Sequence, residues 1–213
     1  MLDNFYKNYY PIKGQKLLLK GKIEKAYQYF EKALLLENNA TNLYNISLAL
    51  LALGRRLEAQ NYLEKVLELM PTSELVLLTL ADLAMQERDW KKAEMYIEKL
   101  ILAYPKNAKY EKYLLRVKNP SARENYIKAK ELLQKANVLI VEKKTKEAIE
   151  ALEKAEKYDP ENPYIQNNLG TFYLQLEKNP KKALTYFQKA YQLEPDNDKF
   201  KQNLFYVRKT IKE

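Results

Sequence analysis

The sequence predicts an all-α fold made of repeated pairs of antiparallel helices, and three observations support this. The composition is 46% hydrophobic and 31% charged, with only 4 glycines in 213 residues, which favours helices over strands and turns. One spacing recurs five times: an alanine, an apolar residue four later, another three later, and a helix stop five further on. The leading alanines are separated by 33, 34, 55 and 35 residues, a period near 34 with one lengthened interval.

Each copy of the spacing predicts one helix, because steps of four and three place apolar side chains along a single stripe. The preceding part of each period then supplies a first helix that pairs with it. The five copies are Ala26/Phe30/Ala33/Asn38, Ala59/Leu63/Val66/Pro71, Ala93/Ile97/Leu100/Pro105, Ala148/Leu152/Ala155/Pro160 and Ala183/Phe187/Ala190/Pro195.

The four glycines fit the same frame. Gly14 and Gly170 are expected on first helices, facing the leading alanine of the second helix, where two small residues allow close packing. Gly21 and Gly54 are expected in the turn between the paired helices, where glycine adopts a positive φ. At the position of Gly14 the other copies carry the small residues Ser47, Ala81 and Ala136.

This pattern resembles the tetratricopeptide repeat, whose motif reads W-x2-L-G-x2-Y, then A-x3-F, then P. The best local match is Leu169-Gly170-Thr171-Phe172-Tyr173, followed by Ala183, Phe187 and Pro195. The resemblance covers about 7–107 and 129–197. It implies a right-handed superhelix, an α-α solenoid of about twelve helices with capping helices.

The motif's tryptophan is not kept in any copy. Trp90 is instead expected in a turn, covering a repeat edge. The residues in the tryptophan's place are Tyr10, Leu43, Leu77, Leu132 and Gln166, of which only Gln166 is polar.

The lengthened interval of 55 residues separates the third repeat from the fourth. Residues 108–118 begin like a first helix, but Asn119-Pro120-Ser121 stops the chain before a second helix can follow. Ser121 and Glu124 have capping-box spacing, which predicts a new helix over about 122–142. We therefore expect an N-terminal block over 1–119, with three repeats and a closing helix, and a C-terminal block over 120–213. The second block has two repeats and a capping helix over 198–212, with a polar outer side.

Composition argues against most enzyme classes. The chain has no cysteine and no histidine, which removes disulfides, thiolate nucleophiles and the commonest metal ligands and bases. The pair Glu150/Glu153 is typical of a solvated helix face. No catalytic residue, metal or cofactor is therefore expected. No stretch has the length and apolarity of a signal peptide or membrane span, which favours a cytoplasmic protein.

The net charge of +9 is spread along the chain. Residues 1–120 hold 19 basic and 14 acidic side chains, and residues 121–213 hold 18 and 14. Most alternate with residues of the opposite charge, as on a solvated helix face. Nucleic-acid binding stays an alternative, with one aromatic and basic cluster to carry it, formed by Tyr6, Tyr9, Tyr10, Lys7 and Lys13.

In the family that the chain resembles, the first helices line a concave groove, so the resemblance implies a scaffold or adaptor that binds a peptide or helix of a partner protein there. The candidates in the first half form an apolar set: Ile12, Leu18, Tyr44, Asn45, Leu48, Leu51, Leu75, Leu78, Asp82 and Met85. Anchors are expected near Leu48, Leu78 and Met85. The candidates in the second half are more polar and suit a peptide backbone: Leu133, Gln134, Asn137, Ile140, Asn167, Asn168, Thr171, Lys199 and Asn203.

Two other occupants of the groove stay open. The N-terminal arm, residues 1–9, could fill it through Phe5, Tyr6 and Tyr9, or the chain could close the groove by forming a homo-oligomer. A two-carboxylate clamp of the kind found in some family members is disfavoured. The chain keeps Asn137, Asn168 and Lys199, but Leu133 and Asn203 stand where the clamp needs cations.

Overall fold

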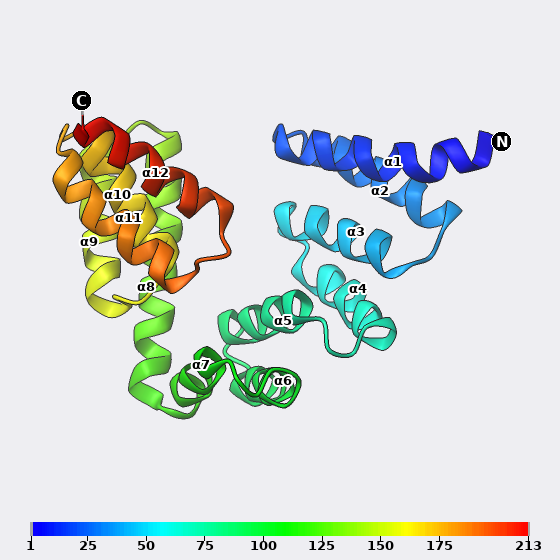
Figure 1. Ribbon diagram of the computed structural model, residues 1–213. Coiled ribbons are helices and arrows are strands. Elements are labelled where there is room, and N and C mark those ends of the chain that lie inside the picture. Colours follow the sequence, from blue (N-terminus) through cyan, green and yellow to red (C-terminus); the bar gives the residue numbers. More distant parts are fainter. Residues whose placement is uncertain (1, 213) are drawn as a thin grey trace. The chain divides into compact units, whose positions relative to one another are not determined.

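The computed structural model describes residues 2–212, and every regular element in that part of the chain is a helix (Figure 1). About twelve helices were expected, and twelve are present in the described range. They are α1 Leu2–Leu19, α2 Ile23–Leu36, α3 Ala40–Ala52, α4 Arg56–Leu69, α5 Glu74–Gln86, α6 Trp90–Ala103, α7 Ala108–Lys118, α8 Pro120–Val141, α9 Thr145–Tyr158, α10 Pro163–Gln175, α11 Pro180–Leu193 and α12 Asp198–Lys212.

The helices form two compact units, one ending at Asn119 and the other starting at Pro120. Unit 1 contains the pairs α1/α2, α3/α4 and α5/α6, followed by α7, and unit 2 contains α8/α9 and α10/α11, followed by α12. The predicted single helices over 108–118 and 198–212 are confirmed. The start predicted for α8 is wrong by two residues: Pro120 occupies the first turn, so Ser121 lies inside the helix and not at its cap.

The repeated stripe forms the core of each pair. All five leading alanines and the large residues four positions later are almost completely buried, which confirms the frame. These residues are Ala26, Ala59, Ala93, Ala148 and Ala183, with Phe30, Leu63, Ile97, Leu152 and Phe187.

Gly14 and Gly170 lie at close helix contacts, but their partners differ from those expected. A Cβ atom at Gly14 would come within 2.4 Å of Phe30, and one at Gly170 within 2.7 Å of Phe187. The glycines therefore face the phenylalanine that follows the leading alanine by four residues. The other copies combine Ser47, Ala81 and Ala136 with Leu63, Ile97 and Leu152 at the matching positions, so a smaller side chain replaces phenylalanine wherever glycine is absent.

Each turn inside a pair contains one residue with a positive φ. Gly21 and Gly54 have φ values of 70° and 77°, as expected. In the turn at Gly54, the Gly54 N–H donates to Leu51 O at 3.0 Å and the Arg55 N–H donates to Leu50 O at 2.9 Å, which satisfies carbonyls at the end of α3. Three non-glycine residues also have positive φ at the matching place, five residues before the leading alanine: Arg88, Lys143 and Lys178.

The turn between α10 and α11 contains one extra residue. It spans residues 176–179, whereas each of the other four pairs has a three-residue turn. Gly170 consequently precedes Ala183 by 13 residues, while Gly14 precedes Ala26 by 12. The insertion lies in the turn, so the close contact between Gly170 and Phe187 is preserved.

Candidate functional site

Side-chain amides connect the first helices of unit 2. Asn168 Nδ2 of α10 donates to Asn137 Oδ1 of α8 at 3.3 Å. Asn203 Nδ2 of α12 donates to Asn167 Oδ1 of α10 at 2.7 Å. We call these four residues the amide row. They come from three helices, and each of the two hydrogen bonds joins one pair of side chains.

The amide row keeps unused hydrogen-bonding groups. Each amide has two donors and one acceptor oxygen, and the two bonds of the row occupy only part of this capacity. Within the described chain, Asn168 Oδ1 and Asn203 Oδ1 accept no hydrogen bond, and Asn137 Nδ2 donates none. Asn137 is exposed, and Asn168 and Asn203 are partly exposed. The row can therefore donate to and accept from a polar chain laid across it.

Asn167 differs from the other three amides because it is buried. Its prediction as a residue that contacts a ligand is wrong: it is packed inside the unit and positions Asn203 instead. Thr171 lies one turn further along α10, and Lys199 lies on α12. Thr171 donates to the Asn167 backbone oxygen at 3.0 Å, and the Lys199 side chain is exposed.

The matching residues of unit 1 are mostly apolar. Leu75 is exposed, and Tyr44, Leu48, Leu51, Leu78 and Asp82 are partly buried. Burial raises the pKa of Tyr44, so its phenol stays protonated at neutral pH and can donate a hydrogen bond. Met85 is buried, because α5 directs this side chain into its own packing. The expectation that Met85 anchors a ligand is therefore wrong.

Asn45 is also buried, contrary to its prediction as a groove residue. It lies where α1 contacts α3, and its Oδ1 accepts a hydrogen bond from Gln15 Nε2 at 3.2 Å. Its Nδ2 has no partner in the described chain. Asn45 therefore joins two first helices and has little contact with solvent.

The proposed filling of the groove by the N-terminal arm is also wrong for the described residues. Residues 2–9 belong to α1, in which Phe5 and Tyr6 are exposed and contact Tyr9 of the same helix. Tyr9 and Tyr10 contact Tyr29 of α2, with ring centroids 6.2 and 6.0 Å apart. Met1, also part of that prediction, lies outside the described residues.

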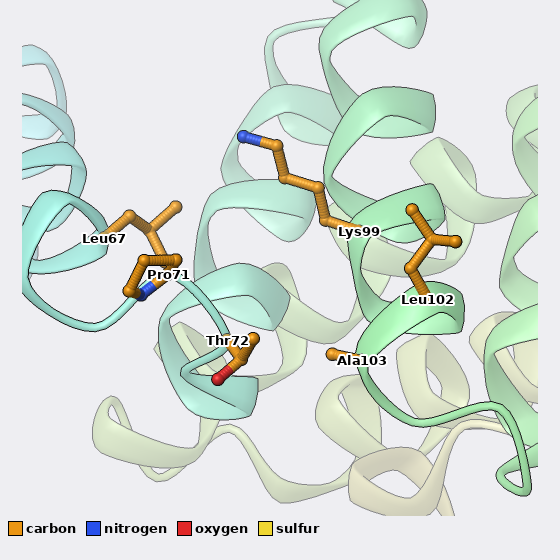
Figure 2. Close-up of a pocket in the computed structure, with 6 residues that line it drawn as sticks. All are labelled: Leu67, Pro71, Thr72, Lys99, Leu102 and Ala103. Atoms are coloured by element: carbon orange, nitrogen blue, oxygen red, sulfur yellow. The ribbon is translucent and has the colours of Figure 1, made fainter.

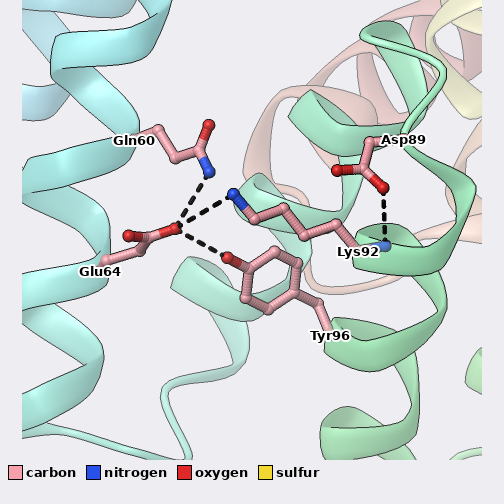
Figure 3. Close-up of polar contacts among 5 residues, drawn as sticks. All are labelled: Gln60, Glu64, Asp89, Lys92 and Tyr96. Atoms are coloured by element: carbon pink, nitrogen blue, oxygen red, sulfur yellow. Dashed lines mark hydrogen bonds and ion pairs between the residues drawn. The ribbon is translucent and has the colours of Figure 1, made fainter.

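A polar network between second helices was not predicted (Figure 3). Glu64 Oε1 of α4 accepts from Gln60 Nε2 at 3.0 Å and from the Tyr96 hydroxyl of α6 at 3.1 Å, and Lys92 Nζ lies 3.7 Å away. Asp89 caps α6 by accepting from the Lys92 N–H at 3.0 Å. The pKa of the Glu64 carboxyl is lowered, first by the hydrogen bond from Gln60. Hydrogen bonds from Tyr96 and Lys92 and the charge of Lys92 lower it further.

Unit 2 contains a related contact. The Tyr173 hydroxyl donates to Glu153 Oε1 at 2.8 Å, and burial together with this carboxylate raises the pKa of Tyr173 to about 12. Tyr186 stacks on Tyr173 at 5.3 Å. The sequence carried part of the signal, because Tyr96 and Tyr186 each follow a leading alanine by three residues. The acceptors differ, since the Tyr186 hydroxyl donates to Glu156 Oε2 at 3.5 Å and not to Glu153, the counterpart of Glu64.

Figure 2 shows a pocket of about 350 Å³ where the turn after α4 meets the end of α6. Its lining is largely apolar and offers a single charged side chain, that of Lys99. The lining residues are Leu67, Pro71, Thr72, Lys99, Leu102 and Ala103.

Across the described residues, no group of three or more acidic side chains is placed to hold a metal ion. No helix in that range has the length and apolarity to cross a membrane.

Three family models match the chain. Two are described as tetratricopeptide repeat, one at residues 50–115 and one at 12–39 and 163–197, and the third is described as TPR repeat, at 136–177. No curated protein sequence matches the chain significantly.

Solved structures share the fold. A tetratricopeptide repeat protein from Parabacteroides merdae is 18% identical, with a TM-score of 0.52, over 95% of this chain and 84% of that one. The structure of the APC/C hetero-tetramer Cut9-Hcn1 gives 16% identity and a TM-score of 0.50, over 94% and 42% of the two chains. MamA from Desulfovibrio magneticus RS-1 is 23% identical, with a TM-score of 0.49, over 91% and 97%. At these identities the likeness concerns the fold alone.

Proposed function

Because the chain belongs to the tetratricopeptide repeat family, we propose that it is a protein-interaction scaffold that binds an extended segment of a partner on its first helices. The amide row is the observation that carries this proposal. An extended peptide presents alternating N–H and C=O groups along its length, and an amide side chain can pair with both. Asn137, Asn168 and Asn203 offer such groups on α8, α10 and α12 of unit 2.

Unit 1 adds apolar contacts for the side chains of a partner. Leu75 is exposed, and Leu48 and Leu78 keep part of their surface accessible. A few apolar anchors of this kind usually provide most of the affinity of an interface, while the surrounding polar contacts fix the register. The amide row supports binding of a peptide backbone by unit 2, and the leucines support binding of apolar side chains by unit 1.

Display of a library of unstructured peptides on the full chain provides ligands for the test. For the selected peptides, the double variant Asn137→Ala/Asn168→Ala should weaken binding roughly tenfold, because about two hydrogen bonds of roughly 0.5–1.5 kcal/mol each are lost. The matched control is Asn61→Ala, which removes an exposed amide from α4, outside the row. Equal affinity of the double variant and the control would contradict binding at the amide row.

The apolar contribution needs its own variants. Leu48→Glu and Leu78→Glu should preserve the helical circular dichroism signal and abolish capture of peptides that carry apolar side chains. The control Leu102→Glu changes a leucine that is exposed at the end of α6. Unchanged capture by the first two variants would contradict binding of apolar side chains by unit 1.

Nucleic-acid binding is the weaker alternative. The aromatic rings of α1 already stack on one another: Phe5 on Tyr9 at 5.6 Å and Tyr6 on Tyr10 at 5.2 Å. Ring faces used in this way are less available to bases. A titration with single-stranded RNA at low and high salt tests this alternative, since phosphate contacts produce a steep loss of affinity with salt.

A further inference from the structure

Helix α1 carries an exposed apolar row that its packing against α2 leaves uncovered, and this row includes Ile12, one of the expected groove residues. Phe5, Ile12 and Leu19 are 60%, 52% and 89% exposed. They are seven residues apart, so they lie along one side of the helix over about 21 Å. We call these three residues the α1 seam.

The α1 seam lies on a strongly basic segment. Residues 5–23 contain five lysines and no acidic residue. Lys16 is exposed and lies next to Ile12 and Leu19 on the helix surface, and the exposed Lys20 directly follows Leu19 beyond the end of α1, whereas Asn8 and Gln15 border the other side of the seam. The seam is therefore a narrow apolar row with positive charge along one edge.

The α1 seam is also held in place before any partner binds. Gly14 packs directly on Phe30 of α2, and Gln15 is hydrogen bonded to Asn45 of α3. Tyr9 and Tyr10 contact Tyr29 on α2. A rigid helix loses little conformational entropy when it docks against another surface, which favours binding.

Three occupants are compatible with an apolar row, and charge and width distinguish them. Two copies of the α1 seam would bring lysines against lysines, which opposes self-association. A helix that lies on a membrane needs an apolar face of about 100° or more, but polar residues on both sides keep this seam to a single row. A partner helix with apolar residues at the same seven-residue period fits the width, and acidic residues beside them fit the charge.

We propose that the α1 seam docks an acidic amphipathic helix of a partner protein. Phe5, Ile12 and Leu19 pack into the apolar face of that helix, and Lys16 and Lys20 pair with its carboxylates. The proposal rests on the proposed function, because Ile12 is one of the expected groove residues of the first helices. The amide row lies in unit 2, so variants of the amide row leave the seam unchanged and the two tests can fail separately.

The test uses the full chain and a synthetic helical peptide of about three heptads, with leucine at the a and d positions and glutamate at e and g. Fluorescence anisotropy at low salt should show saturable binding. A peptide with lysine at e and g should bind at least about tenfold more weakly, and added salt should weaken the glutamate peptide. Ile12→Asp should reduce binding at least about tenfold, because it places a carboxylate in the apolar row.

Leu35→Asp is the matched control, because Leu35 is a largely exposed leucine on α2 that lies outside the seam. The charge-exchange variant Lys16→Glu/Lys20→Glu should reverse the preference and favour the lysine peptide. Circular dichroism checks that each variant remains folded.

Several results would overturn this proposal. They are equal binding by Ile12→Asp and Leu35→Asp, no preference between the two peptides, or an unchanged preference in the charge-exchange variant. Ile12-dependent binding to vesicles of phosphatidylcholine and phosphatidylserine would assign the seam to a membrane surface instead. An Ile12-dependent dimer in sedimentation analysis would assign it to a second copy.

Discussion

At the scale of single residues, side-chain size sets how closely paired helices approach. Gly170 and Gly14 leave room for a phenylalanine ring on the second helix, and a Cβ at either position would overlap that ring. Pairs with serine or alanine at this position carry leucine or isoleucine instead, as in Ala136 and Leu152. The small residue on the first helix and the large residue on the second helix of each pair therefore vary together, so that their combined side-chain volume stays similar within this chain.

Gly170→Ala should lower the free energy of unfolding by about 1–3 kcal/mol, because the new methyl group would lie 2.7 Å from Phe187 atoms. Adding Phe187→Leu recreates the combination found at Ala136 and Leu152. In urea unfolding, the double variant should be more stable than the sum of the two single changes predicts. Strict additivity would mean that the two side chains do not limit each other.

Backbone conformation in the turns gives a second prediction at this scale. Lys143 has a φ of 60°, a conformation that costs most L-residues roughly 1 kcal/mol. Lys143→Gly should therefore raise the free energy of unfolding by about 0.5 kcal/mol, after allowing for the greater freedom of glycine in the unfolded chain. Lys146→Gly, inside α9, is the control and should cost about 1 kcal/mol. Equal losses for both would show that the turn is not strained.

At the scale of helices, the second helices of neighbouring pairs are joined by polar contacts as well as by apolar packing. Glu64 on α4 accepts hydrogen bonds from its own helix and from Tyr96 on α6 (Figure 3). The carboxylate must be ionised to keep Lys92 as a partner. The contact therefore makes the connection between two repeats sensitive to acid.

The pKa of Glu64 is lowered from 4.5 in the folded protein, so its contribution to stability is present above pH 4.5 and is lost as the pH falls through the lowered value. Glu64→Gln should cost about 0.5 kcal/mol at pH 7, a modest value because the group is partly exposed. The cost should shrink as the pH is lowered towards about 3. Urea unfolding at both pH values measures this, with Glu68→Gln on the same helix as control. A cost that does not change with pH would refute the role of the ionised carboxylate.

The sequence predicted helix positions better than it predicted exposure. The helices over 108–118 and 198–212 followed from proline-containing stops and from the missing partner stripe, which are local signals. Met85 and Asn45 were assigned to an open surface, yet both are buried. Their exposure depends on how each helix is rotated against its neighbours, and the spacing of apolar residues fixes that rotation only roughly. The outer face of α12 was expected to be polar, but Phe205 and Tyr206 are exposed on it.

At the scale of the molecule, the chain consists of two compact units that meet at Asn119 and Pro120. Each has its own buried core, and in unit 2 this core extends from Ala129 to Val207. In repeat proteins, stability is mainly the sum of each repeat and its contacts with the nearest neighbours. The division therefore implies that each unit contains most of the contacts that it needs to fold.

Fragments 1–119 and 120–213, produced separately, should each retain most of the helicity per residue of the full chain and unfold cooperatively. Circular dichroism with thermal unfolding tests this. A fragment ending at 103 removes α7 and is expected to be less stable than fragment 1–119, because Tyr110 and Val117 of α7 are buried. An unstructured fragment 120–213 would show that unit 2 needs unit 1 to fold.

The extra residue between α10 and α11 has a practical use. The turn has accepted an insertion while Gly170 kept its contact with Phe187, and Glu177 is exposed within it. Because the chain has no cysteine, Glu177→Cys would provide a unique thiol for labelling with a fluorophore. A dye attached there would sit beyond the end of the helix that carries Asn167 and Asn168, and its emission would report capture of a peptide without an engineered change in the amide row.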